Sequence, residues 1–457
     1  RRVNPKRNLC AAGQGARAAM CKADKEAFDV VADPSTLPKI YHGLTNHNRF
    51  VAADLTVASI DPAKEMIIDG IVYDVSSFAK RHPGGSVIKF QLGSDASDAF
   101  HNFHIRSSKA HKMLKTLPQR PVEAGYQQDA MTRDFEALHQ DLITEGYFEP
   151  NLAHVAYRFA EVIAMYYAGV ALVWSGYWWL GAFVAGIAQG RCGWLQHEGG
   201  HYSLTGNIKL DRHLQMATYG LGCGMSGCYW RNQHNKHHTT PQKLGADPDL
   251  QTLPLVAFHS IIGKKGSKLW LAMQAPLFFG GVITSLVAFG WQFVMHPKHA
   301  FRVGNFTELF WMAARYGLWH AAFGHMGLAA SVQLYMVYLA IGATYIFTNF
   351  AVSHTHKDVI PKDKHISWAL YSANHTTNCT DGPICNWWMA YLNFQIEHHL
   401  FPSMPQYNHP KISPRVKALF EKHGVEYDVR PYWECMRVTF VNLWAVGNRS
   451  HDVSKEE

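Results

Sequence analysis

Three long stretches of the chain contain no Asp, Glu, Lys or Arg: residues 162–190, 269–295 and 316–356. Each is longer than the roughly 20 apolar residues that a membrane-crossing helix needs. Hydrophobic residues make up 47% of the 457 residues, yet the mean hydropathy is only −0.16, so the apolar character is concentrated in segments. This pattern favours an integral membrane protein over a soluble one with a large core. We expect about four transmembrane helices, at 153–174, 176–194, 276–295 and 327–348.

The distribution of charge predicts how these helices are oriented. Residues 191–268 carry nine Lys or Arg against four acidic residues, which is typical of the cytosolic side of a membrane. Four crossings then place both termini and all the polar segments on that side. The net charge of +8 is spread along the chain and indicates contact with an anionic membrane face, with no nucleic-acid partner.

Histidine is concentrated in three short clusters that follow the apolar stretches. The clusters contain seven imidazoles and one amide: His197 and His201; His234, His237 and His238; and Gln395, His398 and His399. Spacings of three and four residues place side chains on one face of a helix, so each cluster directs its ligands to one point. Seven imidazoles exceed what one metal ion can bind. We therefore predict a site for two metal ions at the membrane surface.

Imidazole suits iron, and an oxygen-activating centre keeps open positions beside its protein ligands. We therefore assign all eight clustered residues to a catalytic di-iron site. His354, which follows the last apolar stretch, is a further candidate ligand. His375 is expected to orient ligands from outside the first coordination sphere, and four acids are candidates for the same supporting role: Glu198, Asp247, Asp249 and Glu397.

A different class of enzyme also fits part of this pattern. Residues 197–201 read HEGGH and satisfy the HExxH signature of zinc proteases, so an intramembrane zinc protease is an alternative. That reading needs only one further ligand and leaves most of the clustered histidines without a role. Two adjacent glycines also weaken a helix of the protease type.

The region before the apolar stretches has the pattern of a small haem-binding domain. Residues 67–75 predict two short strands around an Asp-Gly turn, and His82-Pro83-Gly84-Gly85 follows. His104 lies 22 residues further on, after Phe100 and Phe103. Two axial histidines leave no open position on haem iron, which suits electron transfer. The segment resembles cytochrome b5, which implies haem b with His82 and His104 as ligands; His101 is the second choice.

This haem module, taken alone, would also fit an electron-transfer anchor without catalysis of its own. We place the cytochrome b5-like domain at 56–122, after an N-terminal extension (1–55) that we expect to be disordered. Residues 117–122 read as a linker at its end. A further linker and an amphipathic connector follow at 123–152, a membrane domain at 153–445 and a C-terminal tail at 446–457.

The whole pattern, over about residues 60–445, resembles the front-end fatty-acid desaturases. Its most specific mark is QIEHHLFPSMP, where Gln395 occupies a position that is histidine in other membrane desaturases. The strings RCGWLQHEGGHYSLTGNIKLDR and GCGMSGCYWRNQHNKHHTTPQK are most similar to microalgal, haptophyte-like Δ5 enzymes. The resemblance implies a small α+β cytochrome b5-like domain, then an all-α membrane desaturase domain with a cytosolic helical cap.

The resemblance also implies the reaction. Electrons from NADH would pass through an external cytochrome b5 reductase to the haem and then to two iron ions that use O2. A cis double bond would be placed between an existing one and the carboxyl end of a polyunsaturated acyl chain, carried by CoA or a phospholipid. Δ5 action on C20 chains is favoured over Δ6 action on C18 chains, with Δ4 or sphingolipid Δ8 action behind. The expected location is the endoplasmic reticulum membrane.

Overall fold

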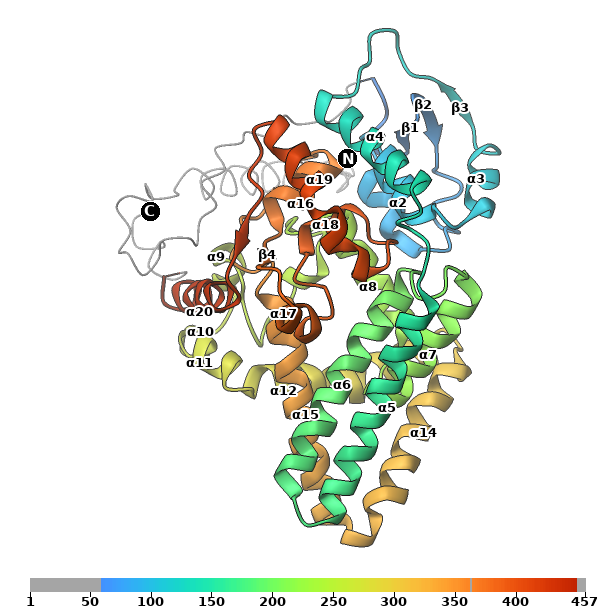
Figure 1. Cartoon of the computed structure of the whole chain (residues 1–457). Helices are drawn as coiled ribbons and strands as arrows, with labels where there is room; N and C mark the ends of the chain where they lie inside the picture. The colour runs from blue at the N-terminus through green and yellow to red at the C-terminus, as the bar shows by residue number, and fades with distance from the viewer. Residues whose placement is uncertain (1–58, 362–363, 450–457) are drawn as a thin grey trace, which may run out of the picture.

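The computed structural model describes residues 59–361 and 364–449. The expected N-terminal extension, 1–55, lies outside these residues, as does most of the expected tail. Figure 1 shows a small domain with a sheet at one end, a bundle of long helices at the other and a cap of shorter helices between them.

The small N-terminal domain is built on a three-stranded antiparallel sheet. Strands β1 (Glu65–Ile68) and β2 (Ile71–Asp74) form the expected hairpin, whose turn residues Asp69 and Gly70 have φ of 52° and 72°. The third strand, β3 (Gln119–Pro121), pairs with β2, so the segment read as a linker is instead part of the sheet. Proline is tolerated there because β3 is an edge strand. Helical segments η3 (Gly85–Gln91), α2 (Ser97–His104) and α3 (Ser108–Leu114) complete the domain.

The connector is the amphipathic helix α4 (Ala130–Thr144). Asp129 caps its N-terminus by accepting a hydrogen bond from the Thr132 N–H at 3.0 Å. One face of α4 is buried, through Met131, Phe135 and Leu142, in a hydrophobic core that it shares with the C-terminal half of the chain.

Four long helices form the bundle: α5 (Leu152–Trp174), α6 (Trp178–Gly200), α14 (Phe306–Phe323) and α15 (Leu328–Ala351). Each contributes one residue to a common buried cluster of Val173, Ala182, Phe323 and Leu334. Helices α5 and α6 approach closely at Gly181 because glycine has no side chain there. A Cβ at this position would lie 2.6 Å from the Gly169 carbonyl oxygen.

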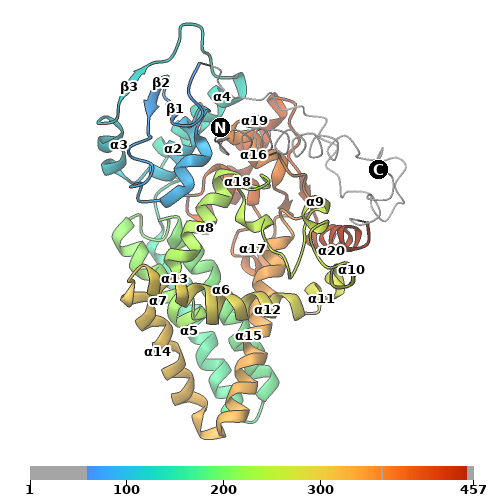
Figure 2. The same cartoon turned by 180° about the vertical axis from the view of Figure 1, so that it is seen from behind.

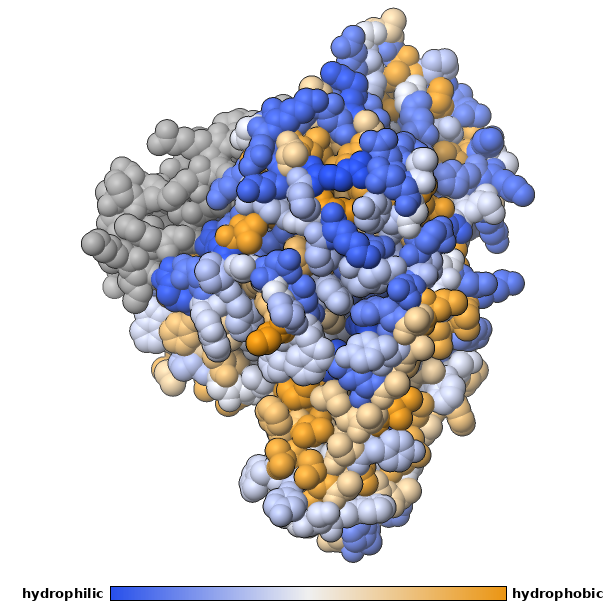
Figure 3. Space-filling view, in the orientation of Figure 1, coloured by the Kyte–Doolittle hydropathy of each residue, from blue (hydrophilic) through white to orange (hydrophobic). Residues whose placement is uncertain are grey.

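The outer surface of the bundle is apolar (Figure 3). Large apolar and aromatic side chains are exposed on it, including Tyr167, Trp179, Phe183, Phe310, Leu318 and Leu328. Trp174, Tyr177 and Trp179 gather at the α5–α6 turn, as expected for an interfacial aromatic belt. By length and composition, α5 and α15 are candidate membrane spans among the described residues.

The expected third span, 276–295, is wrong as a single helix. It is divided into α11 (Gln274–Phe279), α12 (Val282–Gly290) and a π-helical turn (Trp291–Met295, η5), followed by α13 (His296–Arg302). Gly280 and Gly281 separate the first two pieces, and Figure 2 shows α11 and α12 running across the bundle. Helix α12 still packs against α15, where the hydroxyls of Thr284 and Thr344 lie 3.0 Å apart, and α14 reaches α15 through the hydrogen bond from Arg315 to Tyr335.

The cap surrounds the end of the bundle opposite the α5–α6 turn (Figure 1). Its elements before α11 are α7 (Ile208–Cys223), α8 (Gly227–Thr239), η4 (Pro248–Leu250), α9 (Ser260–Gly263) and α10 (Lys268–Ala272). After α15 come α16 (Trp368–His375), β4 (Asn378–Cys379), α17 (Pro383–Trp388), α18 (Gln395–Leu400), η7 (Gln406–Asn408), α19 (His409–Lys422), β5 (Val429–Arg430) and α20 (Tyr432–Arg449). Strands β4 and β5 pair in parallel, and α20 continues through 446–449, where the tail was expected to begin.

Candidate metal centre and haem pocket

The structure brings the three histidine clusters together in two adjacent groups. The ligand atoms of the first group lie within 4.8 Å of one another: His197, His201, His234, His238 and His398. Helix α6 supplies the first two at its end, α8 the next two and α18 the last. The second group, within the same limit, contains His237, His354 and His399. The rings of His238 and His399, one from each group, are stacked with centroids 4.2 Å apart.

His354 therefore lies where the sequence analysis expected a further ligand. Its ring centroid is 4.8 Å from those of both His237 and His399. Burial lowers the pKa of His354 to about 3, so its imidazole is neutral at physiological pH. Gln395 is buried, and it lines the same internal cavity as His354.

The donor set fits metal ions. Several buried ligand atoms lack a hydrogen-bond partner among residues 59–361 and 364–449: Nε2 of His197 and His201, Nδ1 of His238 and His399, both ring nitrogens of His398, and Oε1 of Gln395. Leaving one such atom unsatisfied costs about 1–3 kcal/mol. Because a neutral imidazole gives one nitrogen to a metal ion, coordination would satisfy one nitrogen of each of these rings and the Gln395 oxygen. A set dominated by imidazole suits iron.

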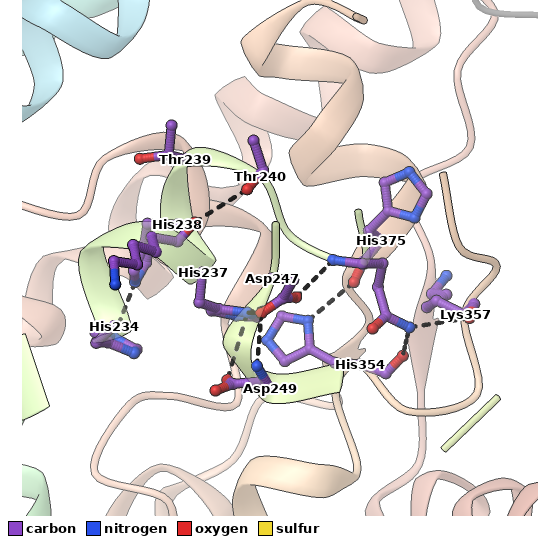
Figure 4. A network of polar contacts seen from close by, with 12 residues as sticks. His234, His237, His238, Thr239, Thr240, Asp247, Asp249, His354, Lys357 and His375 are labelled. Atoms are coloured by element: carbon purple, nitrogen blue, oxygen red, sulfur yellow. Dashed lines mark hydrogen bonds and ion pairs between the residues drawn. The ribbon is translucent and has the colours of Figure 1, made fainter. Parts of the chain in front are cut away.

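Neighbouring groups hold several of these rings in place. Nδ1 of His237 is 3.0 Å from an oxygen of Asp247, and Asp249 lies 3.4 Å from the same nitrogen (Figure 4). Although burial alone would lower the pKa of His237, the two carboxylates raise it. Nδ1 of His354 donates to the backbone carbonyl of His375 at 2.9 Å. Because these contacts engage Nδ1 of both His237 and His354, the Nε2 atoms are available to a metal ion.

The other two acids, Glu198 and Glu397, contact residues that are not candidate metal ligands. Glu198 forms a buried ion pair with Arg158 and accepts a hydrogen bond from the Gln406 N–H at 3.1 Å. This pairing occupies the carboxylate that a zinc protease would need as its base. Glu397 accepts hydrogen bonds from Asn378 at 2.8 Å and from Tyr427 at 2.5 Å. These bonds fix the position of helix α18 and do not contact a candidate metal ligand directly.

Gln406 is a site residue that sequence reasoning missed. Its side-chain amide nitrogen is placed 2.8 Å from Nδ1 of His197, while its Oε1 has no partner in the described part of the chain. If Nε2 of His197 binds metal, Nδ1 carries a proton, and a half-turn of the amide brings Oε1 into position to accept it. The motif QIEHHLFPSMP ends at Pro405, one residue before it, which was the only signal available.

The two glycines of the first cluster have a packing role. A Cβ at Gly200 would lie 2.6 Å from the Trp230 ring and 2.7 Å from the Gln215 amide. Trp230 in turn stacks on His234 with centroids 4.2 Å apart. Glycine at the end of α6 therefore allows α8 to approach closely enough for both helices to contribute ligands.

An apolar cavity of about 190 Å³ reaches the histidines. Helices α6, α12 and α15 line it away from the metal ligands, with Gly190, Gly193, Val287, Ile346 and Phe347 among its walls. The cavity thus offers an apolar chain a path to the point where the two groups of histidines meet.

The two expected haem ligands, His82 and His104, face each other with ring centroids 6.2 Å apart. Bonds of about 2 Å from two imidazole nitrogens to one metal ion, plus about 1 Å from each nitrogen to its ring centre, give a similar separation. The Nδ1 atoms contact the carbonyls of Gly85 and Phe100, at 3.2 and 2.9 Å, which leaves each Nε2 available for iron. Burial lowers the pKa of His104 to about 4, which keeps it neutral. His101 instead contacts Asp69 at the surface, at 2.8 Å.

Comparison with known proteins identifies both regions. Residues 64–120 match the cytochrome b5-like haem/steroid binding domain, and residues 154–431 match the fatty acid desaturase family. An acyl-lipid (8-3)-desaturase from Rebecca salina is 57% identical over 386 residues, which are 83% of this chain and 91% of that protein. An acyl-lipid (8-3)-desaturase from Thraustochytrium sp is 43% identical, over 89% of this chain and 98% of the relative.

A more distant relative extends the comparison to animals. Fatty acid desaturase 3 from Homo sapiens is 31% identical over 388 residues, 81% of this chain and 86% of the human protein. All three relatives are matched across most of their length. Together with the matches of both domains, these similarities show that the chain is an oxidoreductase of the fatty acid desaturase family with a fused cytochrome b5-like domain.

Proposed function

We propose that the chain is a front-end desaturase that places a cis double bond at the Δ5 position of C20 polyunsaturated acyl chains. The observation that carries the proposal is the meeting of two groups of buried histidines with an apolar cavity. The eight histidines and Gln395 would hold two iron ions, and His82 and His104 would hold haem b. Iron bound there would supply O2 activation.

The chain's own residues would bind and shield the substrate. An acyl chain lying between α6, α12 and α15 would be positioned by apolar side chains, with water excluded from the reacting carbons. Two hydrogens leave adjacent carbons of the chain, and O2 is reduced to two waters with two electrons and two further protons. The electrons would come from NADH through an external cytochrome b5 reductase, one at a time through the haem.

The position of the new double bond is the most specific part of the proposal. The names of two relatives pair the numbers 8 and 3, which we read as an existing double bond at carbon 8 and a new one three carbons nearer the carboxyl group. Their names also favour a lipid-linked acyl chain over acyl-CoA. Because the family is membrane-bound and residues 191–268 are rich in basic residues, we place both cofactor sites on the cytosolic face of the endoplasmic reticulum.

Expression in a host that lacks such enzymes tests this function. Cells are fed the C20 acid with double bonds at 8, 11 and 14, the C20 acid with bonds at 11 and 14, or C18 linoleate, and new bonds are located by mass spectrometry. A bond at carbon 5 of the first acid supports the proposal. New bonds only at carbon 8 or carbon 6 of the other acids would replace it with Δ8 or Δ6 action. If no acid gains a bond while haem and iron are both bound, the desaturase proposal fails.

A further inference from the structure

Helix α2, which carries the haem ligand His104, has two functional faces. Phe100 and His104, four residues apart, face the haem pocket, with ring centroids 4.8 Å apart. On another face, Ala99 is buried in a hydrophobic core. The same core contains Ile396 of α18 and Phe401, which directly follows α18. That core is the one to which the connector α4 contributes, so three parts of the chain meet there.

Residues at the end of α2 strengthen this contact. The Phe103 ring packs edge-on against Trp368 of α16, with centroids 5.7 Å apart. Arg106 donates to the carbonyl of Phe148 and, at 3.5 Å, to that of Ser403. The α2 side of the haem domain is therefore held by apolar packing and by hydrogen bonds to the cap.

A second contact joins the haem domain to the helix of the second histidine cluster. Gln91, at the end of η3, donates to the carbonyl of Thr239 at 3.4 Å, and Thr239 directly follows His238. A Cβ at Gly85 would lie 3.0 Å from the amide nitrogen of Asn232 on α8. Figures 1 and 2 agree in showing the haem domain against the cap, with α2 and α8 close to the interface.

Linked domains move relative to each other unless their interface is large and apolar. Here the interface contains the ligand-bearing helix itself. We propose that the haem domain is permanently docked and reduces the metal centre of its own chain through a built-in path in which Ser403 and Gln406 are positioning residues. The inference rests on the cofactors of the proposed function and adds the route between them.

The path is continuous from one ligand to the other. It runs from His104 along the backbone of α2 to the carbonyl of Asn102, which accepts a hydrogen bond from the Ser403 hydroxyl at 2.9 Å. It follows the backbone from Ser403 to Gln406, whose side chain is 2.8 Å from Nδ1 of His197. Each step oxidises the reduced haem by one electron and reduces the iron centre by one. Two such steps, fed by a nicotinamide reductant through the reductase, serve each double bond.

The first test removes the hydrogen bond at the centre of the path. Full-length Ser403→Ala is compared with Ser372→Ala, a matched control that removes another buried serine hydroxyl donating to a backbone carbonyl of the cap. The chains are loaded with both cofactors, the haem is reduced, and its re-oxidation in the presence of O2 and substrate is followed by stopped-flow absorbance. We expect several-fold slower re-oxidation in Ser403→Ala, with the haem spectrum and iron content unchanged. Equal rates in the two variants would overturn the path.

Docking itself has a readout that does not depend on activity. Amide hydrogen exchange in the full chain should show strong protection of residues 97–106 and 396–404. The triple variant Gln91→Leu, Phe103→Ala and Ser403→Ala should lose protection in both segments together, while the far end of the bundle keeps its own. Weak protection of residues 97–106 in the unmodified chain would contradict a permanently docked domain.

A mixing experiment tests transfer within one chain. Full-length His82→Ala, which lacks a haem ligand, and His398→Ala, which lacks an iron ligand, are reconstituted in the same vesicles with NADH and a cytochrome b5 reductase. We expect no desaturation from the mixture, because each docked haem domain serves only its own chain. Restored turnover would overturn the inference. The unmodified chain runs in parallel: if it forms no double bond, it is the proposed function that fails.

Discussion

The haem pocket and the metal centre are built from very different lengths of chain. The two proposed haem ligands, His82 and His104, lie 22 residues apart within one small domain, and their Nδ1 atoms contact backbone carbonyls of that same domain. The proposed metal ligands extend from His197 to His399, and Asp247 and Gln406 contact two of them from other segments. A site of the first kind depends on local turns. A site of the second kind exists only once the bundle and cap have assembled.

The largest effect should follow from removing one imidazole of the metal centre. We expect His398→Ala to abolish desaturation, because His398 belongs to the group of five and both its ring nitrogens lack another partner in the described chain. Iron content should fall while the haem absorbance stays intact. His325→Ala, in the turn at the far end of the bundle, is the control. Full activity in His398→Ala would remove it from the ligand set.

Removing a haem ligand should empty the haem pocket and leave the metal centre intact. We expect His82→Ala to lose the haem absorbance and most of its NADH-driven turnover, since electrons would no longer enter through the haem. The iron content should match that of the unmodified chain, because no metal ligand changes. Measured together, haem spectrum and iron content sharpen the comparison. A joint loss of both would show that the two sites do not assemble independently.

A smaller loss is expected when a ring loses its orienting partner. In Asp247→Asn the charge opposite Nδ1 of His237 is removed while the shape is kept. Changes of this kind cost about 10–100-fold in metal affinity or activity. Iron affinity and turnover are measured against Asp381→Asn, a change of acid to amide on the loop before α17. An effect no larger than that of the control would show that His237 is oriented by other contacts.

Filling the cavity should change selectivity more than rate. Val287→Phe adds bulk to the cavity wall on α12, and one or two carbons in a hydrophobic pocket change discrimination by about tenfold or more. We expect the ratio of C20 to C18 products to fall by about that factor. Val282→Phe, on the exposed side of the same helix, should leave the ratio unchanged. An unaltered ratio in Val287→Phe would place the acyl chain elsewhere.

The smallest effect is expected for the rejected haem ligand. His101→Ala removes a surface contact with Asp69, and such contacts contribute about 0.2–1 kcal/mol to stability. The haem spectrum should be unchanged, and the free energy of unfolding, measured in denaturant, should fall by less than about 1 kcal/mol. Loss of the haem signal would exchange the roles of His101 and His104.

Helical spacing predicted only part of how the candidate metal ligands gather. His234 and His238 of α8 do lie in one group, but His237 of the same helix lies in the other, and α18 divides His398 and His399 in the same way. Gln406 could not be found in this way. A single amide contacts His197 across more than 200 residues only because the cap folds back over α6, and no local pattern records that contact.

Hydropathy did not predict the break in the expected third span, for an equally physical reason. Residues 276–295 lack charge, but a glycine pair divides them. Helix α14 was overlooked because it carries Glu308 and Arg315, and both are buried with partners. Glu308 accepts hydrogen bonds from the Ser226 hydroxyl and from the Cys228 N–H, and Arg315 donates to Tyr335 and Tyr338. A rule that counts charges cannot recognise charges that tertiary contacts have satisfied.

The length of α14 has a consequence for the lipid around the protein. Its 18 residues extend about 27 Å, whereas the 23 residues of α5 extend about 35 Å. The shorter helix matches a thin bilayer, and the longer one fits the same bilayer by tilting. On the proposal that both helices cross the membrane, a thick, sterol-rich bilayer would have to thin beside α14, and we expect the protein to partition away from such a membrane.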